Sequence, residues 1–531
     1  MVDSSQSRML PVQAESVKRR YAATLFTQFM QLSASVITAG IAPRALGPAS
    51  YGSYNFLLNT ASTIQSFLDP SATQAFFTFS SQDRRSGSLT KIYALLLLAQ
   101  IIIILMVIGI LSLAGLTDWI WPDQAVDKII WVTILGWLLF VIPSLRQLGD
   151  SKGLTVRTQA MTLMTAIINV VGLLGLNAFG LLNFYTYVWL NLFTAVLIGL
   201  LLVYWLLIVN RDLCWDGGWF TRAQEYIQRW WRFSSPLILL EYYRPLVAYL
   251  STYLLQRWYG SVEQGHFALA FRWSALVLIF TSSALSIFWR EIANAMANGE
   301  RERAIRTYLR FTRMLFFLAF VLCTWLSFSG HFLVEILAGD QYQLAIPVLA
   351  LMAYYPLQQT YGQLNIAALK GSEKTVVVRN LGILVSIPDV LLSYFLLASP
   401  DAPIAGLGLG ALGVAIRMVG YGLLSVQAYE WMSHKTFGLN YFNTLAQKLG
   451  VVLVVFICAG LTLWGISGML VSAGLAGIWT LGISSAAYFT LVAAIALIKP
   501  DLAGLSRAEV RDNLQQGRAL LFRFFTRAKR E

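Results

Sequence analysis

Long segments of this chain contain almost no charged residues, and this feature limits the folds that are open to it. Of 531 residues, 57% are hydrophobic and only 12% are Asp, Glu, Lys or Arg, whereas soluble domains carry roughly a quarter charged residues. A helix that crosses a bilayer needs about 20 apolar residues, because lipid offers its backbone no hydrogen-bond partners. The sequence therefore predicts an all-α integral membrane protein.

Hydropathy predicts about fourteen transmembrane helices, which together with short loops use nearly the whole chain. The expected spans are residues 21–42, 52–79, 90–116, 128–147, 158–180, 184–209, 233–256, 265–289, 311–336, 344–368, 377–398, 404–430, 446–466 and 469–498. The first span follows about twenty mostly polar residues and itself contains polar side chains, so we do not interpret it as a secretory signal. A tight turn near Gly468 is expected between the last two spans.

The basic residues predict which ends of these helices face the cytoplasm. With the N-terminus inside, the cytoplasmic segments hold 33 of the 39 Lys and Arg residues. Residues at the ends of the expected spans are counted with the adjoining segment. The outside loops then hold Arg44, Lys128 and Arg257, and only Arg244, Arg272 and Arg417 lie deep within the spans. By the positive-inside rule, both termini are therefore cytoplasmic, and we expect the protein in the cytoplasmic (inner) membrane. The net charge of +13 then reflects orientation and contact with anionic lipid, and predicts no nucleic-acid partner.

The remaining motifs predict no metal, no cofactor and no direct use of ATP. The three cysteines and three histidines are scattered, without the spacing of a disulfide framework or a metal site. The segment 371–375 contains a Lys-Thr pair but lacks the glycine spacing of a nucleotide-binding loop. The basic and apolar tail, residues 499–531, predicts an amphipathic helix at the inner leaflet, with a disordered basic tail as the alternative.

Two short motifs recur along the chain and indicate an internal repeat. Arg44, Gly47, Gly52 and Tyr54 recur as Arg257, Gly260, Gly265 and Phe267, all at an offset of 213 residues. The sequence Gly-x-x-Lys followed by Val-Arg occurs at 149–157 and again at 371–379, at an offset of 222. Both pairs fall at equivalent turns, so spans one to six and seven to twelve are two copies of one unit. Parallel repeats of this kind are typical of transporters that bind substrate between the halves.

The repeat predicts two pseudo-symmetric six-helix lobes and two additional C-terminal helices. The expected parts are a cytoplasmic N-terminal segment 1–20, an N-lobe 21–210, a linker 211–232, a C-lobe 233–430, two helices within 431–498 and the tail 499–531.

Polar stripes on the first two spans predict a cavity. The first span carries polar residues at helical steps of three and four, among them Gln28, Gln31 and Ser35, and the second does so at Asn55, Asn59 and Asp69. Adding the repeat offset to these two stripes places polar residues on spans seven and eight, which include Glu241, Arg244, Ser251, Arg272 and Ser282. Because a polar stripe against lipid is costly, we expect spans one, two, seven and eight to surround a shared polar cavity.

The charged residues of these stripes predict binding of an anion. An arginine inside a span costs about 2.5–3.5 kcal/mol on insertion scales, and its planar fork matches phosphate oxygens. We therefore expect Arg244 and Arg272 to bind an anionic, phosphate-bearing headgroup. The alternative for Arg244 is a structural pair with Glu241, three residues earlier. Arg417 lies off the four central spans and is expected to pair with a neighbour, and Asp69 either contacts an ion or sugar or caps a helix at a kink.

The fourteen spans, the two six-helix halves and the turn Leu46–Tyr54, with its Leu-Gly-x4-Gly-x-Tyr pattern, resemble the polysaccharide transporters of the multidrug/oligosaccharidyl-lipid/polysaccharide exporter superfamily. The resemblance covers essentially the whole chain. It implies a two-lobed fold, alternating access and a polyprenyl-pyrophosphate-linked oligosaccharide as substrate, such as an O-antigen or exopolysaccharide unit. It also implies a monomer among membrane lipids that works with polysaccharide polymerase and assembly proteins.

Three other functions were weighed against this flippase. Lipid II flippases of the superfamily have a cationic first lobe, whereas Gln28, Gln31 and Asn59 are neutral here. A multidrug or small-molecule exporter is the first alternative, although the drug/ion antiporter branch usually has twelve helices. A membrane polymerase or ligase would need a cluster of catalytic residues on a large outside loop, and the longest one expected, residues 117–127, is short. The sequence therefore favours a transporter that is not an enzyme.

Overall fold

The computed structural model describes residues 17–69, 71–82, 87–151, 155–205, 219–235, 238–475 and 477–505, and these residues form helices and no strands. Contacts divide the chain into two compact units. The first unit comprises residues 1–46 and 53–253, and the second comprises residues 47–52 and 254–531. The long helix that contains the seventh and eighth spans therefore contributes to both units.

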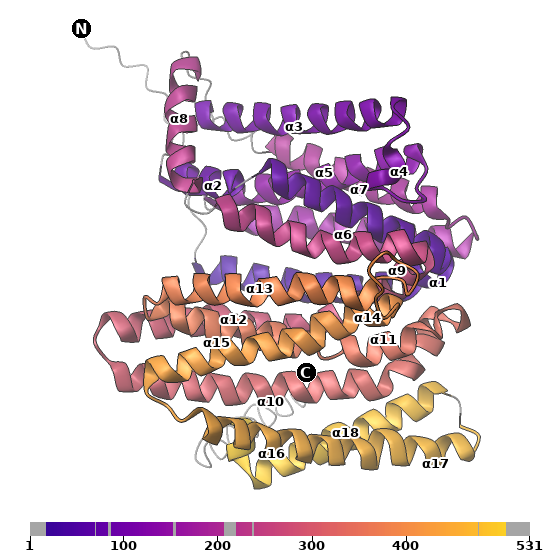
Figure 1. Ribbon diagram of the computed structural model, residues 1–531, viewed down its shortest axis with the longest axis vertical. Helices are drawn as coiled ribbons and strands as arrows, with labels where there is room; N and C mark the ends of the chain where they lie inside the picture. Colours follow the sequence, from indigo (N-terminus) through magenta and orange to yellow (C-terminus); the bar gives the residue numbers. More distant parts are fainter. Residues whose placement is uncertain are drawn as a thin grey trace, which may run out of the picture. The chain divides into compact units, whose positions relative to one another are not determined.

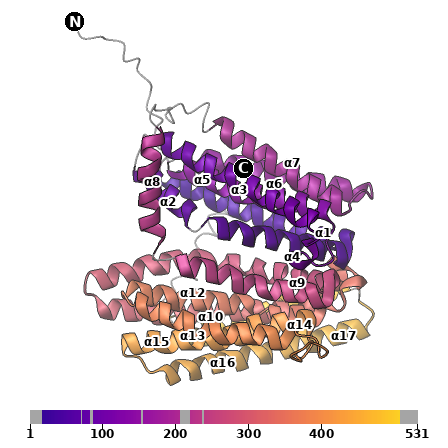
Figure 2. The same cartoon turned by 45° about the horizontal axis from the view of Figure 1, so that its top comes forward.

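The first unit is a bundle of apolar helices. Its elements are α1 (Val17–Leu68, except residues 47–52), α2 (Ala72–Gln82), α3 (Gly87–Leu113), α4 (Thr117–Ile120), α5 (Val126–Ser151), α6 (Thr155–Ala178), α7 (Phe184–Val203), α8 (Trp219–Ser234) and the first part of α9 (Ile238–Ala297). Helices α5, α6 and α7 pack side by side (Figure 1). The amphipathic helix α8 instead runs across α2 and α3 (Figures 1 and 2), and Arg229 lies 4.5 Å from the centre of the Phe79 ring.

The second unit is built around a single long helix. Its elements are the rest of α9, α10 (Arg301–Leu333) with a π turn (Val334–Ala338), a 3-10 turn (Asp340–Tyr342), α11 (Ala345–Met352), α12 (Tyr355–Gly371), α13 (Thr375–Leu397), α14 (Gly410–Ala415), the π-helical segment η4 (Ile416–Tyr421), α15 (Gly422–Phe437), α16 (Tyr441–Ala459) with a π segment (Gly460–Ile466), α17 (Ser467–Ser472), α18 (Gly477–Ile498) and the 3-10 turn η6 (Pro500–Ala503). Helix α10 packs against α12 on one side and against α16 and α18 on the other (Figure 1).

All fourteen expected spans fall on helices, and the protein is an all-α membrane protein with about fourteen transmembrane helices. Nine of the helices in the described residues are both long and apolar enough to cross a membrane. The other five expected spans are the first, second, seventh, eighth and tenth, which lie in α1, α2, α9, α11 and α12. Four of these five are the spans with the polar stripes. Spans with this many polar residues need contact with protein or water, because lipid cannot satisfy their polar groups.

The internal repeat is visible in the backbone. Gly47 breaks α1 with φ 73° and ψ 164°, and Gly260, its equivalent in the repeat, breaks α9 with φ 72° and ψ −170°. This region of backbone space is accessible essentially only to glycine. The same local conformation at equivalent positions confirms that the two motifs are copies of one turn, and it joins two spans in each half.

A second glycine pair in the motifs makes a reciprocal contact within the second unit. A Cβ atom added to Gly52 would lie 1.7 Å from the Ser261 carbonyl oxygen, and one added to Gly265 would lie 2.1 Å from the Pro48 carbonyl oxygen. Ser261 is the repeat equivalent of Pro48, at the same offset of 213. The two motifs therefore cross as a pseudo-symmetric pair, and glycine is needed at both positions because backbone meets backbone.

Three local predictions were wrong. The second span does not run unbroken over 52–79, because the chain leaves the helix after Leu68 and starts α2 at Ala72. The last turn is not at Gly468, which lies inside α17. It is at Gly474, whose φ of 79° ends the helix and whose neighbour Leu475 donates its N–H to the Leu470 carbonyl. The seventh span does not begin at residue 233, because α8 extends to Ser234, beyond the expected linker 211–232, and α9 begins at Ile238.

Candidate functional site

The predicted polar face of the first span lies on α1 in the first unit. Gln28 is exposed, and Gln31 and Ser35 are half-buried. The large apolar side chains Phe29 and Val36, which lie elsewhere around the same helix, are 66% and 46% exposed. An exposed apolar face suits lipid, so the helix has separate apolar and polar faces, as the stripe predicted.

The second polar stripe continues along α1 and ends in a helix cap. Asn55 is half-buried and Asn59 is exposed. Asp69 accepts hydrogen bonds from the Thr73 backbone N–H at 3.0 Å and from the Thr73 hydroxyl at 2.5 Å. The Thr73 hydroxyl is also 2.6 Å from the Tyr93 hydroxyl. Asp69 thus holds the first turn of α2, which supports the capping interpretation and also ties α2 to α3.

The predicted residues of the second half lie along α9. Ser251 is buried and Arg272 is exposed. The side chains of Glu241, Arg244 and Ser282 lie outside the described residues. Nine of the eleven predicted residues belong to the first unit, and Arg272 and Ser282 belong to the second. Their convergence on one cavity remains a prediction.

Sequence reasoning missed a buried ion pair in the second unit. The Lys448 ammonium on α16 donates to both carboxylate oxygens of Glu430 on α15, and the two side chains are 10% and 0% exposed. The Tyr361 hydroxyl on α12 donates to the same carboxylate at 2.9 Å. The Lys448 ammonium also lies 4.1 Å from the centre of the Tyr361 ring, so each charge has a partner.

The sequence did contain a signal for this pair. Glu430 and Lys448 lie near the facing ends of two consecutive predicted spans. Residues that flank a short turn between antiparallel helices are brought close together. The pair links α16, the first of the additional helices, to α15 of the second unit.

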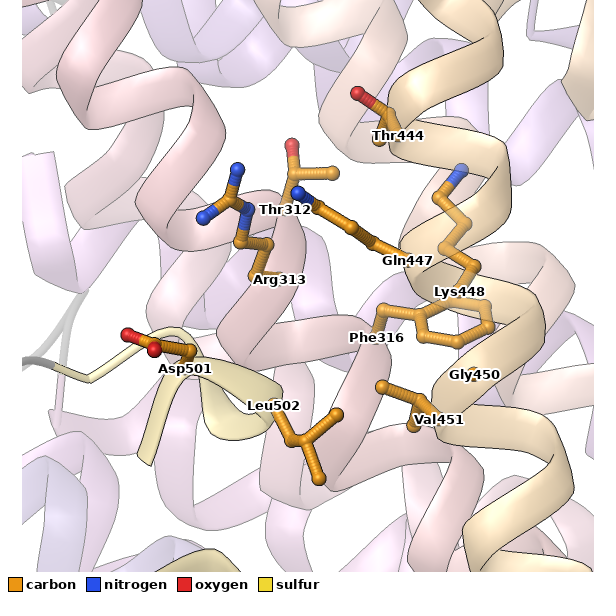
Figure 3. A pocket seen from close by; sticks show the side chains of 10 residues that line it. All are labelled: Thr312, Arg313, Phe316, Thr444, Gln447, Lys448, Gly450, Val451, Asp501 and Leu502. Atoms are coloured by element: carbon orange, nitrogen blue, oxygen red, sulfur yellow. The ribbon is translucent and has the colours of Figure 1, made fainter. Parts of the chain in front are cut away.

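A cavity of about 230 Å³ lies beside this pair, between α10, α16 and η6 (Figure 3). The Gln447 side chain points across it toward Thr312 and Arg313, and Asp501 lies at its margin, whereas the Lys448 ammonium points away (Figure 3). Phe316, Val451 and Leu502 give it a largely apolar wall. The cavity lies where the additional helices meet the second unit.

A second cavity, of about 210 Å³, lies in the second unit between α12, α13, η4 and α15. Its lining is polar and includes Gln358, Gln359, Ser386 and the pair of Asp389 with Arg417. The Arg417 Nη1 donates to the Asp389 carboxylate at 2.8 Å. The expectation that Arg417 pairs with a neighbour is therefore confirmed, and the neighbour is a carboxylate on the adjacent span.

Comparison with known proteins gives one family and several similar structures. The family described as "Polysaccharide biosynthesis protein" matches residues 18–289, just over half of the chain. No curated protein matches the chain by sequence.

The structure resembles a lipid II flippase, MurJ, in an inward closed conformation, with a TM-score of 0.61, 13% identity and coverage of 90% of this chain and 98% of that one. It also resembles an inward-facing MATE family multidrug resistance transporter of the MOP superfamily, with a TM-score of 0.58, 13% identity and coverage of 80% and 98%. A MOP superfamily transporter from Pyrococcus furiosus gives a TM-score of 0.51 at 13% identity, with coverage of 82% and 99%. At these identities the likeness establishes the fold alone, and it extends over nearly the full length of each relative.

Proposed function

Since the match over residues 18–289 shows that the chain belongs to the polysaccharide biosynthesis protein family, we propose that it is a flippase for a lipid-linked oligosaccharide. The substrate is a polyprenyl pyrophosphate that carries an O-antigen, exopolysaccharide or similar repeat unit. The protein moves its head from the inner to the outer leaflet of the cytoplasmic membrane by alternating access, while the lipid tail stays in the bilayer. Both termini of the protein are cytoplasmic.

The observation that carries this proposal is the polarity of the four spans that the repeat relates to one another. Gln28, Gln31 and Asn59 offer amide groups, which suit sugar hydroxyls. Arg244 and Arg272 offer the positive charge that a pyrophosphate requires. A substrate with both a neutral sugar part and an anionic part fits both sets of groups. Transporters with internal repeats bind such substrates between their halves.

Two features favour transport over synthesis. The similar structures are those of a flippase and a multidrug transporter. The acidic residues of the longest outside loop are also engaged locally. The Asp118 carboxylate accepts the Asp123 backbone N–H at 2.8 Å, and Asp127 accepts the Tyr185 hydroxyl at 2.6 Å. Their contacts hold the loop and its helix ends together, so we assign them a structural role.

The test is the substitution Arg272→Ala. Hydrogen bonds to a charged group contribute about 1.5–3 kcal/mol, so losing them should slow flipping by roughly ten- to a hundredfold. Arg272→Lys keeps the charge but not the planar fork, and should restore activity only in part. The measurement is translocation of a lipid-linked oligosaccharide in proteoliposomes, at equal protein content.

Arg290→Ala is the matched control, because Arg290 is an exposed arginine on the same helix, α9, but lies outside the expected span. It should keep normal flipping. Full activity in Arg272→Ala would contradict the proposed role of Arg272. Transport of a small organic cation by the native protein, with no transport of the lipid-linked oligosaccharide, would favour the multidrug exporter instead.

A further inference from the structure

The polar cavity of about 210 Å³ in the second unit lies deep within its helices. Asp389 is eight residues from the end of α13 at Leu397, and Arg417 is seven residues from the start of α14 at Gly410. At about 1.5 Å per residue, both lie roughly 10–12 Å from helix ends on the same side, well inside a hydrocarbon core of about 30 Å. Ionisable residues at this depth are costly and usually functional.

The cavity lies against the side of α13 opposite its exposed apolar residues. On α13, the apolar residues Ile383, Leu384, Ile387 and Leu391 are 49–66% exposed. Val385, Ser386 and Asp389 line the cavity instead. Gly422 makes room for one of its amide side chains, because a Cβ there would lie 2.8 Å from Gln358 Cγ. Polar groups are therefore gathered on the inner side of this group of helices.

The Arg417 side chain has an unused binding edge. Arg417 is 8% exposed, and its Nη1 is taken by Asp389. Its Nε is buried and has no hydrogen-bond partner among the described residues. A guanidinium donates two parallel hydrogen bonds to a carboxylate or phosphate along such an edge. Arg417 also lies in the π-helical segment η4, a feature frequent at functional sites.

The size and lining of the cavity limit the ligand. Water occupies about 30 Å³ per molecule in the liquid, and pockets for drug-sized ligands measure about 300–1,000 Å³. A cavity of about 210 Å³ therefore holds a small group, such as one phosphate or carboxylate. The Gln358 amide and the second N–H of the Gln359 amide can donate to oxygen atoms of such a group. The Gln359 Nε2 already donates once to Gln358 Oε1, and the Ser425 hydroxyl donates to the Gly422 carbonyl.

Charge balance predicts that binding of this anion is accompanied by uptake of one proton. Asp389 and Arg417 together are neutral, so an oxyanion that binds at Arg417 adds an uncompensated negative charge inside the membrane. If the Asp389 carboxylate takes up one proton from water, it becomes a neutral carboxylic acid, and the Arg417 charge is balanced by the oxyanion. Burial of charge strongly favours this neutral arrangement.

Few other groups can supply this charge compensation. The other titratable residues in the lining are Tyr355 on α12 and Tyr421 on η4, and phenols stay neutral near pH 7. The charged residues of the helices around the cavity are Lys370 on α12, Arg379 on α13, and Glu430, His434 and Lys435 on α15, and none of these lines it. Helices α11 and α14 carry no charged residue.

We propose that this cavity is a proton-linked binding site for a single small oxyanion, in which Arg417 binds the anion and Asp389 is the proton acceptor. None of its lining residues belongs to the polar stripes predicted for the substrate head. Its evidence comes from the second unit alone and does not depend on the flippase proposal.

The test uses dimethyl phosphate, which keeps one negative charge across the useful pH range. Its binding to the full-length protein in nanodiscs is measured by calorimetry, without transport. We expect affinity to rise as pH falls from about 8 to about 5.5, by up to about tenfold per pH unit, with uptake of one proton per bound anion. Asp389→Asn should bind more tightly than the native protein at the higher pH and should lose the pH dependence.

Further variants separate the anion site from general effects of charge. Arg417→Gln should abolish binding, and Arg417→Lys should weaken it by at least tenfold because the planar fork is lost. Arg379→Gln, an exposed arginine on the same helix α13, should bind like the native protein. If Arg417→Gln does not fold, the other variants still provide the test. Native affinity that is equal at both pH values, or an Arg417→Lys variant that binds normally, would overturn the proposal.

A competition experiment identifies the source of the oxyanion. A prenyl pyrophosphate incorporated in the nanodisc should displace dimethyl phosphate if the site binds a lipid headgroup. A small free oxyanion is the ligand if the prenyl pyrophosphate does not compete and inorganic phosphate does. Both results support an oxyanion site, whereas the absence of dimethyl phosphate binding at either pH contradicts it.

Discussion

At the scale of single residues, the glycines of the repeated motif have the most clearly defined role. Gly52→Ala places a methyl group against the Ser261 carbonyl, where a Cβ would be only 1.7 Å away, so backbone must move. Overpacking of this kind costs typically 1–3 kcal/mol. We expect a lower midpoint of thermal unfolding in detergent. The control is Gly109→Ala, because a Cβ on Gly109 meets nothing within 4 Å. Equal midpoints for the two variants would contradict the crossing.

The buried pair of Glu430 and Lys448 gives a second prediction at this scale. Glu430→Gln leaves the Lys448 charge without its carboxylate in buried surroundings, which costs about 3–5 kcal/mol. Adding Lys448→Met should recover much of this loss, because it removes the unpaired charge. The measurement is a double-mutant cycle of unfolding free energies.

The matched control for that cycle is Glu302→Gln. Its carboxylate is 89% exposed and lies 3.6 Å from Arg306, so its loss should change stability by no more than about 0.5 kcal/mol. If Glu430→Gln lowered the free energy of unfolding as little as Glu302→Gln does, the ion pair would not stabilise the attachment of α16 to the second unit.

The equivalence of the motif glycines in the two halves could be predicted from the sequence, but the ion-pair partners of charged side chains could not. Gly47 and Gly260 were aligned by their spacing alone, and their shared backbone conformation follows from the absence of a Cβ. The Asp389 partner of Arg417 lies 28 residues away on another helix. Pairing of this kind depends on how far each helix is rotated about its axis. Hydropathy gives the length of a span but not this rotation.

At the scale of elements, the polar stripe of α1 predicts which face of the first span contacts water. Single cysteines at Gln28, Gln31 and Ser35 should react with a water-soluble thiol reagent. Cysteines at Phe29 and Val36, which are large exposed apolar residues of the same helix, should react slowly because lipid covers them and excludes thiolate chemistry. Faster labelling at Phe29 and Val36 would refute the cavity assignment.

Helix ends could be predicted where the composition changes from apolar to polar, but not where they depend on the backbone conformation of a glycine. The apolar helices α3, α6 and α13 lie within three residues of their expected spans at both ends, because polar residues flank each run. Gly468 and Gly474 are equivalent as letters in the sequence, but only Gly474 takes a positive φ. Helix α8 was not predicted because the expected spans were chosen as long apolar runs. Its apolar and charged residues are interspersed in the sequence and separate onto different faces only in the helix.

At the scale of the whole molecule, the repeat in the sequence agrees with the fold, and both could be predicted from the sequence. Two copies of one unit explain why the polar spans are the first, second, seventh and eighth, which occupy equivalent places in the halves. The two additional helices are outside the repeat, and their attachment depends on Lys448 and on the packing of α18 against α10. The sequence predicted their presence, but the contacts that hold them became evident only from the structure.

The sidedness of the molecule is the last prediction, and it follows from the basic residues. With 33 Lys and Arg in expected cytoplasmic segments and three in outside loops, the loop 117–127 should lie outside and the turn after α9 should lie inside. In a background without native cysteines, Ala125→Cys should be labelled in intact cells by a membrane-impermeant thiol reagent. Asn298→Cys, which is also at an exposed position, should be labelled only after permeabilisation. The reverse pattern would invert every cytoplasmic and outside loop, and it would reverse the direction of transport proposed for the protein.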